Sequence, residues 1–358
     1  MDFNTFKKTV SYNHYKKLSK KEPVWIFGAG GFAKGLAKVL IREGYPVCGF
    51  IVSEPTGNTL LDLPVTGWDS IDHGQLVMGV FSHDVPYTKM LAEAAEHGFN
   101  DLFMPWELYA QFTDQLGWRY WLTPRNYITD HLDENEQVYN SLADTESQEC
   151  LLNALLFRVG LNTDHAAYKS TETHYFNDIS LNGFEGRAIT LIDGGAYTGD
   201  TYQDAINATQ IKTAFLFEPD PKNFSQLTHN VGGNAMCYPM ALADTYKILT
   251  FASDVGPSSA VVKQGDIHIA AGAIDELFPK QHIDFIKFDI EGCEADAIHG
   301  AKETIKRERP VLVMAGYHKP GDLWNLPLLL NSVCDNYKLY IRQHDYNSFE
   351  SVVYAIPN

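Results

Sequence analysis

The chain has 358 residues, with 45 acidic and 28 basic side chains and a formal net charge of −17. Nucleic acid and anionic membranes are therefore not expected as main partners, because binding to phosphate groups requires a basic face. With 45% hydrophobic and 20% charged residues, the composition is that of a folded globular protein rather than a disordered one.

Residues 1–22 are expected to form an N-terminal helical segment, because Phe3, Phe6 and Val10 recur at helical spacing. This segment lacks the apolar core of a signal peptide. No apolar run elsewhere approaches the roughly 20 residues that span a bilayer. We therefore expect a soluble, cytoplasmic protein without a membrane partner.

Residues 23–105 alternate short apolar runs with helical patterns. Three runs are predicted strands, "VWIFG", "PVCGFIV" and "QLVMGVF", and two are predicted helices, "FAKGLAKVLIREG" and "YTKMLAEAAEHG". Strands that alternate with helices imply a parallel sheet with helical crossovers. This segment is therefore predicted to be a small Rossmann-like domain.

Residues 106–180 show helical periodicity with many aromatic residues, in "WELYAQFTDQLGWRYWL" and "DTESQECLLNALLFRVG". We interpret them as a helical bridge whose aromatic side chains face a core rather than a ligand. The α/β alternation restarts at Ile189 and is expected to continue through a second domain, residues 181–358. Its last strands, "KLYIRQH" and "SVVYAI", surround "DYNSFE" and are predicted to form an antiparallel hairpin at the sheet edge.

The predicted fold is thus α/β, with two Rossmann-like parallel-sheet domains joined by a helical segment. The five cysteines are widely spaced and include no CxxC pair. Neither a disulfide framework nor a zinc site is expected from that pattern.

A glycine-rich turn follows the strand Ile189–Ile192 and reads D-G-G-A-Y-T-G-D from Asp193 to Asp200. Small residues let a ligand approach the backbone here, and a helix N-terminus follows. A dinucleotide-binding turn would read G-x-G-x-x-G and place a pyrophosphate over that helix end. Carboxylates at both ends of the turn disfavour a pyrophosphate. They suit a ligand with positive charge, such as the ammonium and sulfonium of S-adenosylmethionine.

Two more carboxylates follow the next strands. Glu218 ends "TAFLFEP", 25 residues after Asp193, where an acidic residue accepts both ribose hydroxyls. NAD makes the same demand, so Glu218 does not separate the two cofactors. Asp244, in "ALAD" after the third strand, is placed for an adenine amino group. Each carboxylate alone has an alternative role as a cap, but three at one sheet edge indicate a cofactor site.

An ordered set of motifs then indicates a family. "LIDGGAYTGDT", "FLFEPDPKNFSQL", "ALAD", "IDFIKFDIEGCEADAIHGA" and "YHKPGDLWNLP" together resemble the FkbM family of S-adenosylmethionine-dependent methyltransferases. The resemblance covers roughly residues 145–358, and its most specific element is K-x-D-x-E-G-x-E at Lys287, Asp289, Glu291 and Glu294. It implies a class I methyltransferase fold. It also implies methyl transfer to a hydroxyl group of a sugar, a glycan or a glycosylated metabolite.

The family resemblance brings an expected cofactor site with it, and no metal site is assigned. Many family members have a glutamate at the end of the fifth strand, just before the histidine. Here that strand ends "VMAGYH", with Ala315 and Gly316, which leaves the base and any metal dependence open. The residues expected to bind S-adenosylmethionine are Asp193, Gly194, Gly195, Ala196, Tyr197, Gly199, Asp200, Thr201, Glu218, Pro219, Asp244 and Asp289.

Methyl transfer to an alcohol needs a base that removes the hydroxyl proton during an in-line displacement. Three candidates follow the fourth and fifth strands: Asp289, Glu291 and His318. His318 is the first choice, because an imidazole titrates near neutrality. Asp289 and Glu291 are alternatively expected to orient the acceptor or to hold a divalent cation. Further candidates for acceptor contacts are Tyr317, Trp324, Ser258 and Ser259.

An earlier glycine turn, "FGAGGFAKG", matches G-x-G-x-x-A at Gly28, Gly30 and Ala33. The following strand ends in Ser53 and Glu54, so a ribose-binding carboxylate would be offset by one residue. Residues 24–105 also resemble the N-terminal domain of sugar O-acyltransferases, which binds a nucleotide sugar. Three hypotheses remain for this turn: a nucleotide-sugar pocket, a dinucleotide pocket, or strand–helix packing without a ligand.

Two other functions compete with methyl transfer. An NAD-dependent sugar oxidoreductase would use the first turn, but no Tyr-x-x-x-Lys proton relay accompanies it. A non-catalytic nucleotide-sugar sensor would need a decayed methyltransferase site, whereas Asp193, Gly195, Glu218 and Asp289 are all present.

Overall fold

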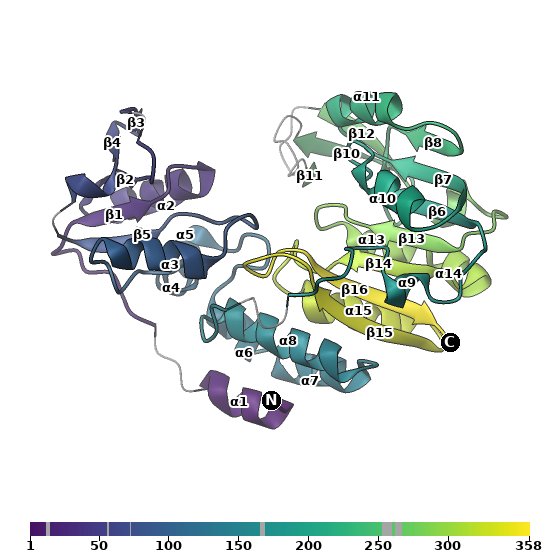
Figure 1. Ribbon diagram of the computed structural model, residues 1–358, viewed down its shortest axis with the longest axis horizontal. Coiled ribbons are helices and arrows are strands. Elements are labelled where there is room, and N and C mark those ends of the chain that lie inside the picture. Colours follow the sequence, from purple (N-terminus) through teal and green to yellow (C-terminus); the bar gives the residue numbers. More distant parts are fainter. Residues whose placement is uncertain (12–14, 56, 72, 165–168, 253–259, 262–266) are drawn as a thin grey trace. The chain divides into compact units, whose positions relative to one another are not determined.

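The computed structural model describes residues 1–11, 15–55, 57–71, 73–164, 169–252, 260–261 and 267–358 (Figure 1). The chain forms two compact units. The N-terminal unit comprises Met1–Leu132, Leu151–Lys169 and Asp345–Phe349, and the C-terminal unit comprises Asp133–Cys150, Ser170–His344 and Glu350–Asn358. In the described residues, no helix combines the length and the apolar run that crossing a bilayer requires.

The N-terminal unit contains a five-stranded sheet in the order β3-β4-β2-β1-β5. The predicted strands are β1 (Val24–Phe27), β2 (Val47–Ile51) and β5 (Gln75–Met78), and the predicted helices are α2 (Gly31–Arg42) and α3 (Tyr87–Glu96). The antiparallel pair β3 (Thr59–Leu60) and β4 (Leu63–Thr66) was not predicted. Its turn residues Leu61 and Asp62 both have positive φ without the glycine or asparagine that normally indicates such a turn.

The first helix of this unit, α1 (Phe3–Ser11), buries Phe3, Phe6 and Val10 along one face. The segment predicted as a helical bridge contributes to both units. Most of its aromatic side chains are buried, including Trp106 and Trp121, whereas Trp118 is exposed. Its helices are α4 (Pro105–Gln111), α5 (Thr113–Leu116), α6 (Arg125–Thr129), α7 (Leu132–Ser141), α8 (Thr145–Arg158) and α9 (Asp178–Leu181). The domain boundaries given by the sequence stay predictions.

The C-terminal unit is built on a seven-stranded sheet in the order β15-β16-β14-β13-β6-β7-β8 (Figure 1). Five neighbouring strands run parallel, whereas β16 is antiparallel to β14 and β15. The α/β fold with an antiparallel edge hairpin is therefore confirmed. The strands are β6 (Ile189–Gly194), β7 (Ile211–Phe217), β8 (Ala235–Tyr238), β13 (Phe285–Phe288), β14 (Val311–Ala315), β15 (Tyr337–Gln343) and β16 (Ser351–Pro357).

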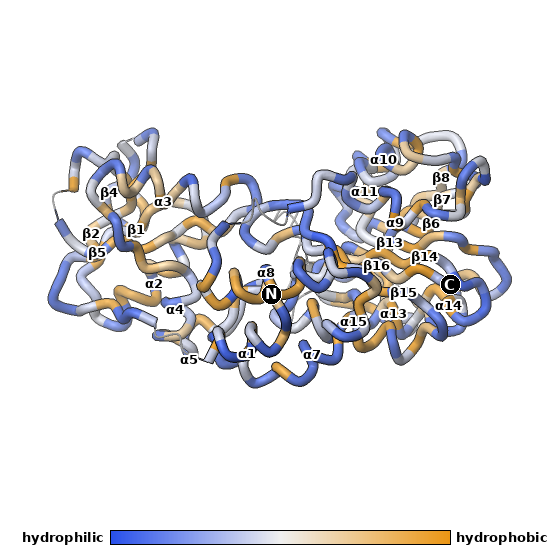
Figure 2. The backbone as a smooth tube through the Cα atoms, turned by 60° about the horizontal axis from the view of Figure 1, so that its bottom comes forward, coloured by the Kyte–Doolittle hydropathy of each residue, from blue (hydrophilic) through white to orange (hydrophobic). Residues whose placement is uncertain are grey.

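The middle strands are mostly hydrophobic, as is typical of parallel strands that are buried on both faces. Every residue of β6, β13 and β14 is buried, and the hydrophobic colouring of β13 and β14 can be followed in Figure 2. The helices of this unit beyond α9 are α10 (Asp200–Ala208), α11 (Pro221–Asn230), α12 (Ile274–Leu277), α13 (Glu294–Gly300), α14 (Lys302–Glu308) and α15 (Asp322–Val333).

A second, four-stranded sheet interrupts the α/β alternation, so the expectation of uninterrupted alternation was wrong here. Its order is β11-β10-β12-β9, with bounds Ala260–Val261, Lys247–Ala252, Ile267–Gly272 and Ala241–Leu242. The apolar run "AMCYPMAL" does not form one strand but is divided between β8 and β9. Pro239 lies at the division, where a residue without an N–H ends strand pairing.

Strand order reverses between β6 and β13, since successive strands extend outward from both. In open α/β sheets, ligands bind beyond the carboxyl ends of the strands at such a reversal. The Asp193–Asp200 segment begins with the last two residues of β6 and ends at the first residue of α10, so the fold places it at the expected ligand-binding edge.

The first glycine turn, after β1, allows a matched test of its packing role. A Cβ on Gly28, whose φ is +105°, would lie 2.8 Å from Val80 Cγ2, whereas a Cβ on Gly30 would meet nothing within 4 Å. Gly28→Ser should therefore lower the free energy of unfolding by about 2 kcal/mol or more. Gly30→Ser, which keeps a favourable helix N-cap, should change it by less than about 0.5 kcal/mol. Urea denaturation of both variants measures this, and equal effects would contradict a packing role specific to Gly28.

Candidate active site

A buried ion pair joins β6 and β13 at the strand reversal. Asp193 and Lys287 are register partners, and Lys287 Nζ lies 3.0 Å from Asp193 Oδ1. Their side chains are 0% and 1% exposed. Burial alone would lower the pKa of Lys287, but Asp193 and then Asp289 raise it above its usual value, so the lysine is charged. Lys287 Nζ also donates to the carbonyl oxygens of Gly195, at 2.8 Å, and Gly194.

The backbone N–H groups of the glycine turn after β6 donate hydrogen bonds within the protein. Gly195 has φ +76°, and a Cβ there would lie 1.8 Å from the Asp289 carbonyl oxygen, so only glycine fits. Gly195 and Ala196 N–H both donate to the Phe217 carbonyl, at 3.0 and 2.9 Å. Tyr197 N–H donates to Glu218, and Gly199 N–H donates to the Ala196 carbonyl. These four amides are therefore not available to cradle a pyrophosphate, which is the role a dinucleotide turn requires.

Glu218 directly follows β7 beside this turn, and its carboxylate is held by two backbone amides. Its Oε1 accepts from Asp220 N–H at 2.8 Å and its Oε2 from Tyr197 N–H at 3.0 Å. Burial raises the pKa of Glu218 to about 7, although both amide donors lower it. Each oxygen retains a second lone pair, so the carboxylate can accept two further hydroxyl donors.

The other residues expected to bind the cofactor differ in how deeply they are buried. Asp193, Gly194 and Ala196 are buried, whereas Tyr197, Thr201 and Pro219 are half-buried and Asp200 is exposed at the start of α10. Gly199 has φ +95° and precedes that helix. Asp244 follows β9 in the small sheet, where its exposed carboxylate accepts from Lys247 Nζ at 2.5 Å. Its expected contact with adenine stays a prediction.

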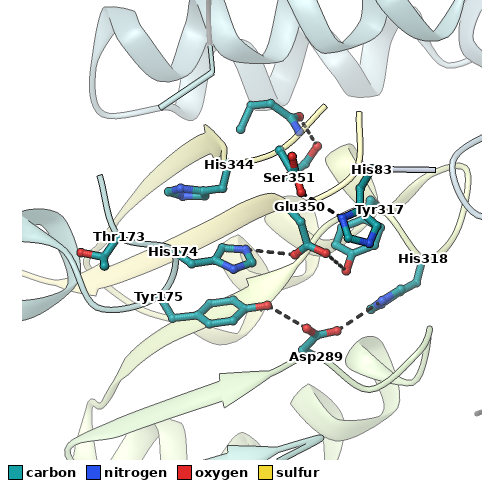
Figure 3. A network of polar contacts seen from close by, with 12 residues as sticks. His83, Thr173, His174, Tyr175, Asp289, Tyr317, His318, His344, Glu350 and Ser351 are labelled. Atoms are coloured by element: carbon teal, nitrogen blue, oxygen red, sulfur yellow. Dashed lines mark hydrogen bonds and ion pairs between the residues drawn. The ribbon is translucent and has the colours of Figure 1, made fainter. Parts of the chain in front are cut away.

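Asp289, just past β13, is held from two sides (Figure 3). Tyr175 OH donates to Oδ2 at 2.8 Å, and His318 Nε2 lies 3.3 Å from Oδ1. His318 Nδ1 lies 2.8 Å from Glu294 Oε1, which also accepts from the backbone N–H groups of Ile290 and Gly292. Because this carboxylate oxygen only accepts, Nδ1 carries a proton and Nε2 faces Asp289.

The predicted acid–base character of His318 needs a correction. Burial alone would lower its pKa, but Glu294, Asp289 and Glu291 raise it well above its ordinary value. The expectation that this imidazole titrates near neutrality was therefore wrong, because three carboxylates surround it. The side chain is also only 2% exposed, whereas those of Asp289 and Glu291 are 27% and 23% exposed. The two carboxylates are therefore partly exposed, whereas the histidine is not.

Three site residues were not assigned a role from sequence. Glu294 fixes the orientation of His318, as described above. His174 and Glu350 form a second polar group with Tyr317, whose hydroxyl donates to Glu350 at 2.7 Å. "HYFNDI" and "DYNSFE" contain both residues, but only the folded hairpin brings Glu350 beside the end of β14.

The four residues expected to contact the acceptor have different outcomes. Trp324 is 0% exposed inside α15, so stacking of its ring on a sugar was a wrong expectation. Ser258 and Ser259 lie outside the described residues. Tyr317 is buried and belongs to the Glu350 group.

No group of three or more histidine, cysteine, aspartate or glutamate side chains in the described ranges is arranged to hold a metal ion. In the N-terminal unit, Glu54 is exposed in the loop after β2, and Ser53 Oγ donates to Glu93 at 2.6 Å. A nucleotide-sugar pocket and the resemblance to sugar O-acyltransferases stay predictions for this unit.

Comparison with known proteins identifies the activity of the C-terminal unit. Residues 193–348 match the family model described as "Methyltransferase FkbM domain". The C-terminal unit is a methyltransferase. The match begins at Asp193 and includes the glycine turn, Glu218, Asp289 and His318.

Among solved structures, the chain is similar over almost its whole length to methyltransferase FkbM from Methylobacillus flagellatus KT. The TM-score is 0.74 at 20% sequence identity, covering 99% of this chain and 98% of that chain. An rRNA methylase from Streptococcus thermophilus has a TM-score of 0.31 at 11% identity, over 48% of this chain and 87% of that one. No curated protein matches the sequence. The methyltransferase fold is thus confirmed by the first structure.

The charge of His318 predicts a pH dependence of methyltransferase stability. Its folded-state pKa lies above the unfolded value of 6.5, so its stabilising contribution is complete below about pH 6.5 and is lost as the pH rises through the folded pKa. The excess stability of wild type over His318→Gln should therefore shrink between pH 6 and pH 9, by at most about 1.4 kcal/mol per pH unit.

Urea denaturation at several pH values measures that difference. His299→Gln, which changes an exposed histidine of α13, is the matched control and should show no comparable trend. A difference for His318→Gln that stays constant or grows with pH would contradict the assigned charge.

Proposed function

We propose that the protein is an S-adenosylmethionine-dependent O-methyltransferase that acts on a hydroxyl group of a sugar, a glycan or a glycosylated metabolite. The observation that carries the cofactor assignment is Glu218, whose carboxylate is preset by two backbone amides next to a glycine turn whose own amides are occupied. Such a site accepts ribose hydroxyls but offers little to a pyrophosphate.

The surrounding residues fit this cofactor chemically. Asp200 adds negative charge near the helix N-terminus, which favours a cationic ligand. Asp193 is completely buried against Lys287, so we assign it to shaping the turn rather than to direct contact. Gly194 and Gly195 let the turn pack closely against the protein, because a Cβ there would lie 2.9 Å from Leu242 Cδ1 and 1.8 Å from the Asp289 carbonyl oxygen. When bound, S-adenosylmethionine supplies a methyl group activated by its sulfonium.

The acceptor hydroxyl must lose its proton as its oxygen attacks the methyl group, and a positioned base contributes typically 10²–10⁴-fold to the rate. We propose that Asp289, which is partly exposed and ionised, is the base that accepts this proton. Burial alone would raise the pKa of Asp289, but Lys287, His318 and Tyr175 lower it below its usual value. His318 then acts through Asp289: it fixes one carboxylate oxygen and compensates its charge, while Glu294 fixes His318.

The assignment of Glu218 predicts a pH dependence of cofactor binding. Because its pKa is about 7, the carboxylate is mostly protonated at pH 6 and mostly ionised at pH 8. Affinity for S-adenosylhomocysteine should therefore fall about tenfold from pH 8 to pH 6. Glu218→Gln should bind about 30-fold more weakly at pH 8 and lose most of this pH dependence.

Isothermal titration calorimetry measures both quantities. Glu303→Gln changes a side chain that is 70% exposed on α14 and serves as the control, with wild-type affinity expected. Unchanged affinity in a folded Glu218→Gln variant, or binding of NAD in place of S-adenosylhomocysteine, would contradict the cofactor assignment.

If Asp289 is the base, removing its charge should lower kcat without weakening cofactor binding. Asp289→Asn should lower kcat by at least about 100-fold with cofactor affinity within about threefold, because the side chain contacts the acceptor. Glu291→Gln changes the neighbouring carboxylate, 3.9 Å from the same His318 nitrogen, and should have the smaller effect.

Transfer from labelled S-adenosylmethionine to a panel of sugar acceptors measures these rates. A larger loss in Glu291→Gln than in Asp289→Asn would assign the base to Glu291 instead. Loss of transfer on chelation, restored by magnesium, would replace the carboxylate base with a metal-lowered hydroxyl pKa.

A further inference from the structure

Two carboxylates in the C-terminal unit are bound by the same pair of dipeptides in a crossed pattern (Figure 3). The dipeptides are His174–Tyr175 and Tyr317–His318, and the carboxylates are Asp289 and Glu350. Each carboxylate contacts the tyrosine of one dipeptide and the histidine of the other. The Asp289 group consists of Asp289, Tyr175 and His318, and the Glu350 group consists of Glu350, Tyr317 and His174. The proposed proton transfer uses the first group and not the second.

The Glu350 group lacks hydrogen bonds at two atoms. Glu350 Oε2 and His174 Nε2 lie 3.0 Å apart, yet within the described part of the chain neither atom has an aligned hydrogen-bond partner. In contrast, Glu350 Oε1 accepts from Tyr317 OH at 2.7 Å. A buried acceptor and a buried ring nitrogen without hydrogen bonds are costly, so the pair gains stability if a ligand bonds to both.

The chain holds Glu350 at this place against a backbone preference. Its φ is +55°, which for a residue other than glycine costs of order 1 kcal/mol or more. The next residue, Ser351, makes two hydrogen bonds. Its carbonyl oxygen accepts from Gly316 N–H at 2.7 Å, and its Oγ donates to Gln343 at 2.6 Å. These contacts fix the start of β16 beside the end of β14 and hence fix the Glu350 carboxylate close to Tyr317.

The Glu350 group is also partly exposed, although Glu350 Oε2 and His174 Nε2 are themselves buried. The side chains of Glu350 and His174 are 21% and 29% exposed, comparable to 27% for Asp289 and unlike 2% for His318. Both carboxylates also influence the same tyrosine. Burial is the main reason that the pKa of Tyr175 is raised, and the negative charges of Asp289 and Glu350 raise it further. The two carboxylates are thus connected through the same two dipeptides.

We infer that Glu350 and His174 bind a second, non-reacting hydroxyl of the acceptor while Asp289 takes the proton of the methylated one. A hydroxyl both donates and accepts, so it would donate to Glu350 Oε2 and accept from His174 Nε2. The acceptor class is then a polyol with two nearby hydroxyl groups, as in a pyranose ring, rather than an isolated alcohol or phenol. This inference rests on the proposed function.

The test uses the full-length protein saturated with S-adenosylhomocysteine and a fixed panel of probes: the methyl pyranosides of glucose, galactose, mannose and rhamnose. Binding is measured by ligand-observed NMR. At least one pyranoside should bind wild type, and Glu350→Gln and His174→Gln should weaken it at least about tenfold. Glu303→Gln, outside the network, should bind it as wild type does.

A deoxy analogue identifies the hydroxyl concerned. For the bound pyranoside, one monodeoxy analogue should lose affinity for wild type yet bind Glu350→Gln no more weakly than the parent sugar does. Failure of every pyranoside to bind wild type, or equal binding to wild type and Glu350→Gln, would overturn the inference. Calorimetry with S-adenosylhomocysteine then separates this inference from the proposed function. After either of those outcomes, only the acceptor inference fails if wild type binds S-adenosylhomocysteine, whereas the proposed function fails if wild type does not bind it.

Discussion

The buried pair of Lys287 and Asp193 is the constraint on which the rest of the site depends. It joins the two strands between which the strand order reverses, and removing one partner from such a pair typically costs about 3–5 kcal/mol, because the other charge is left buried and unpaired. The same lysine bonds to the carbonyl of Gly195, which sets the direction of the glycine turn. Asp289 follows two residues later, so this ion pair fixes the glycine turn and the strand end that carries Asp289 together.

The sequence predicted the features that depend on strand order alone. Hydrophobic runs such as "IDFIKFD" indicated strands buried on both faces, and the carboxyl ends of parallel strands meet at one edge whatever the intervening loops do. Asp193, Glu218 and Asp289 were therefore assigned to one region before their contacts were known. The edge hairpin could also be predicted from the sequence, because two alternating runs surround a short polar segment.

Features that depend on side-chain surroundings could not be predicted in this way. His318 has the raised pKa of an imidazole among three carboxylates, and residue type alone indicates the opposite behaviour. Glu350 joins the site only because an antiparallel strand returns beside β14, and His174 comes from a loop without a periodic pattern. The small sheet containing β10 and β12 was missed for a related reason: its strands resemble those of a continuing α/β unit.

The most direct test of the cofactor assignment is a crystal structure of the full-length protein with S-adenosylhomocysteine. The ribose hydroxyls should lie within about 3.2 Å of the Glu218 carboxylate, with the sulfur directed toward Asp289 and the Lys287–Asp193 pair unchanged. Ligand density above the first glycine turn at Gly30, or a ribose without contact to Glu218, would contradict it.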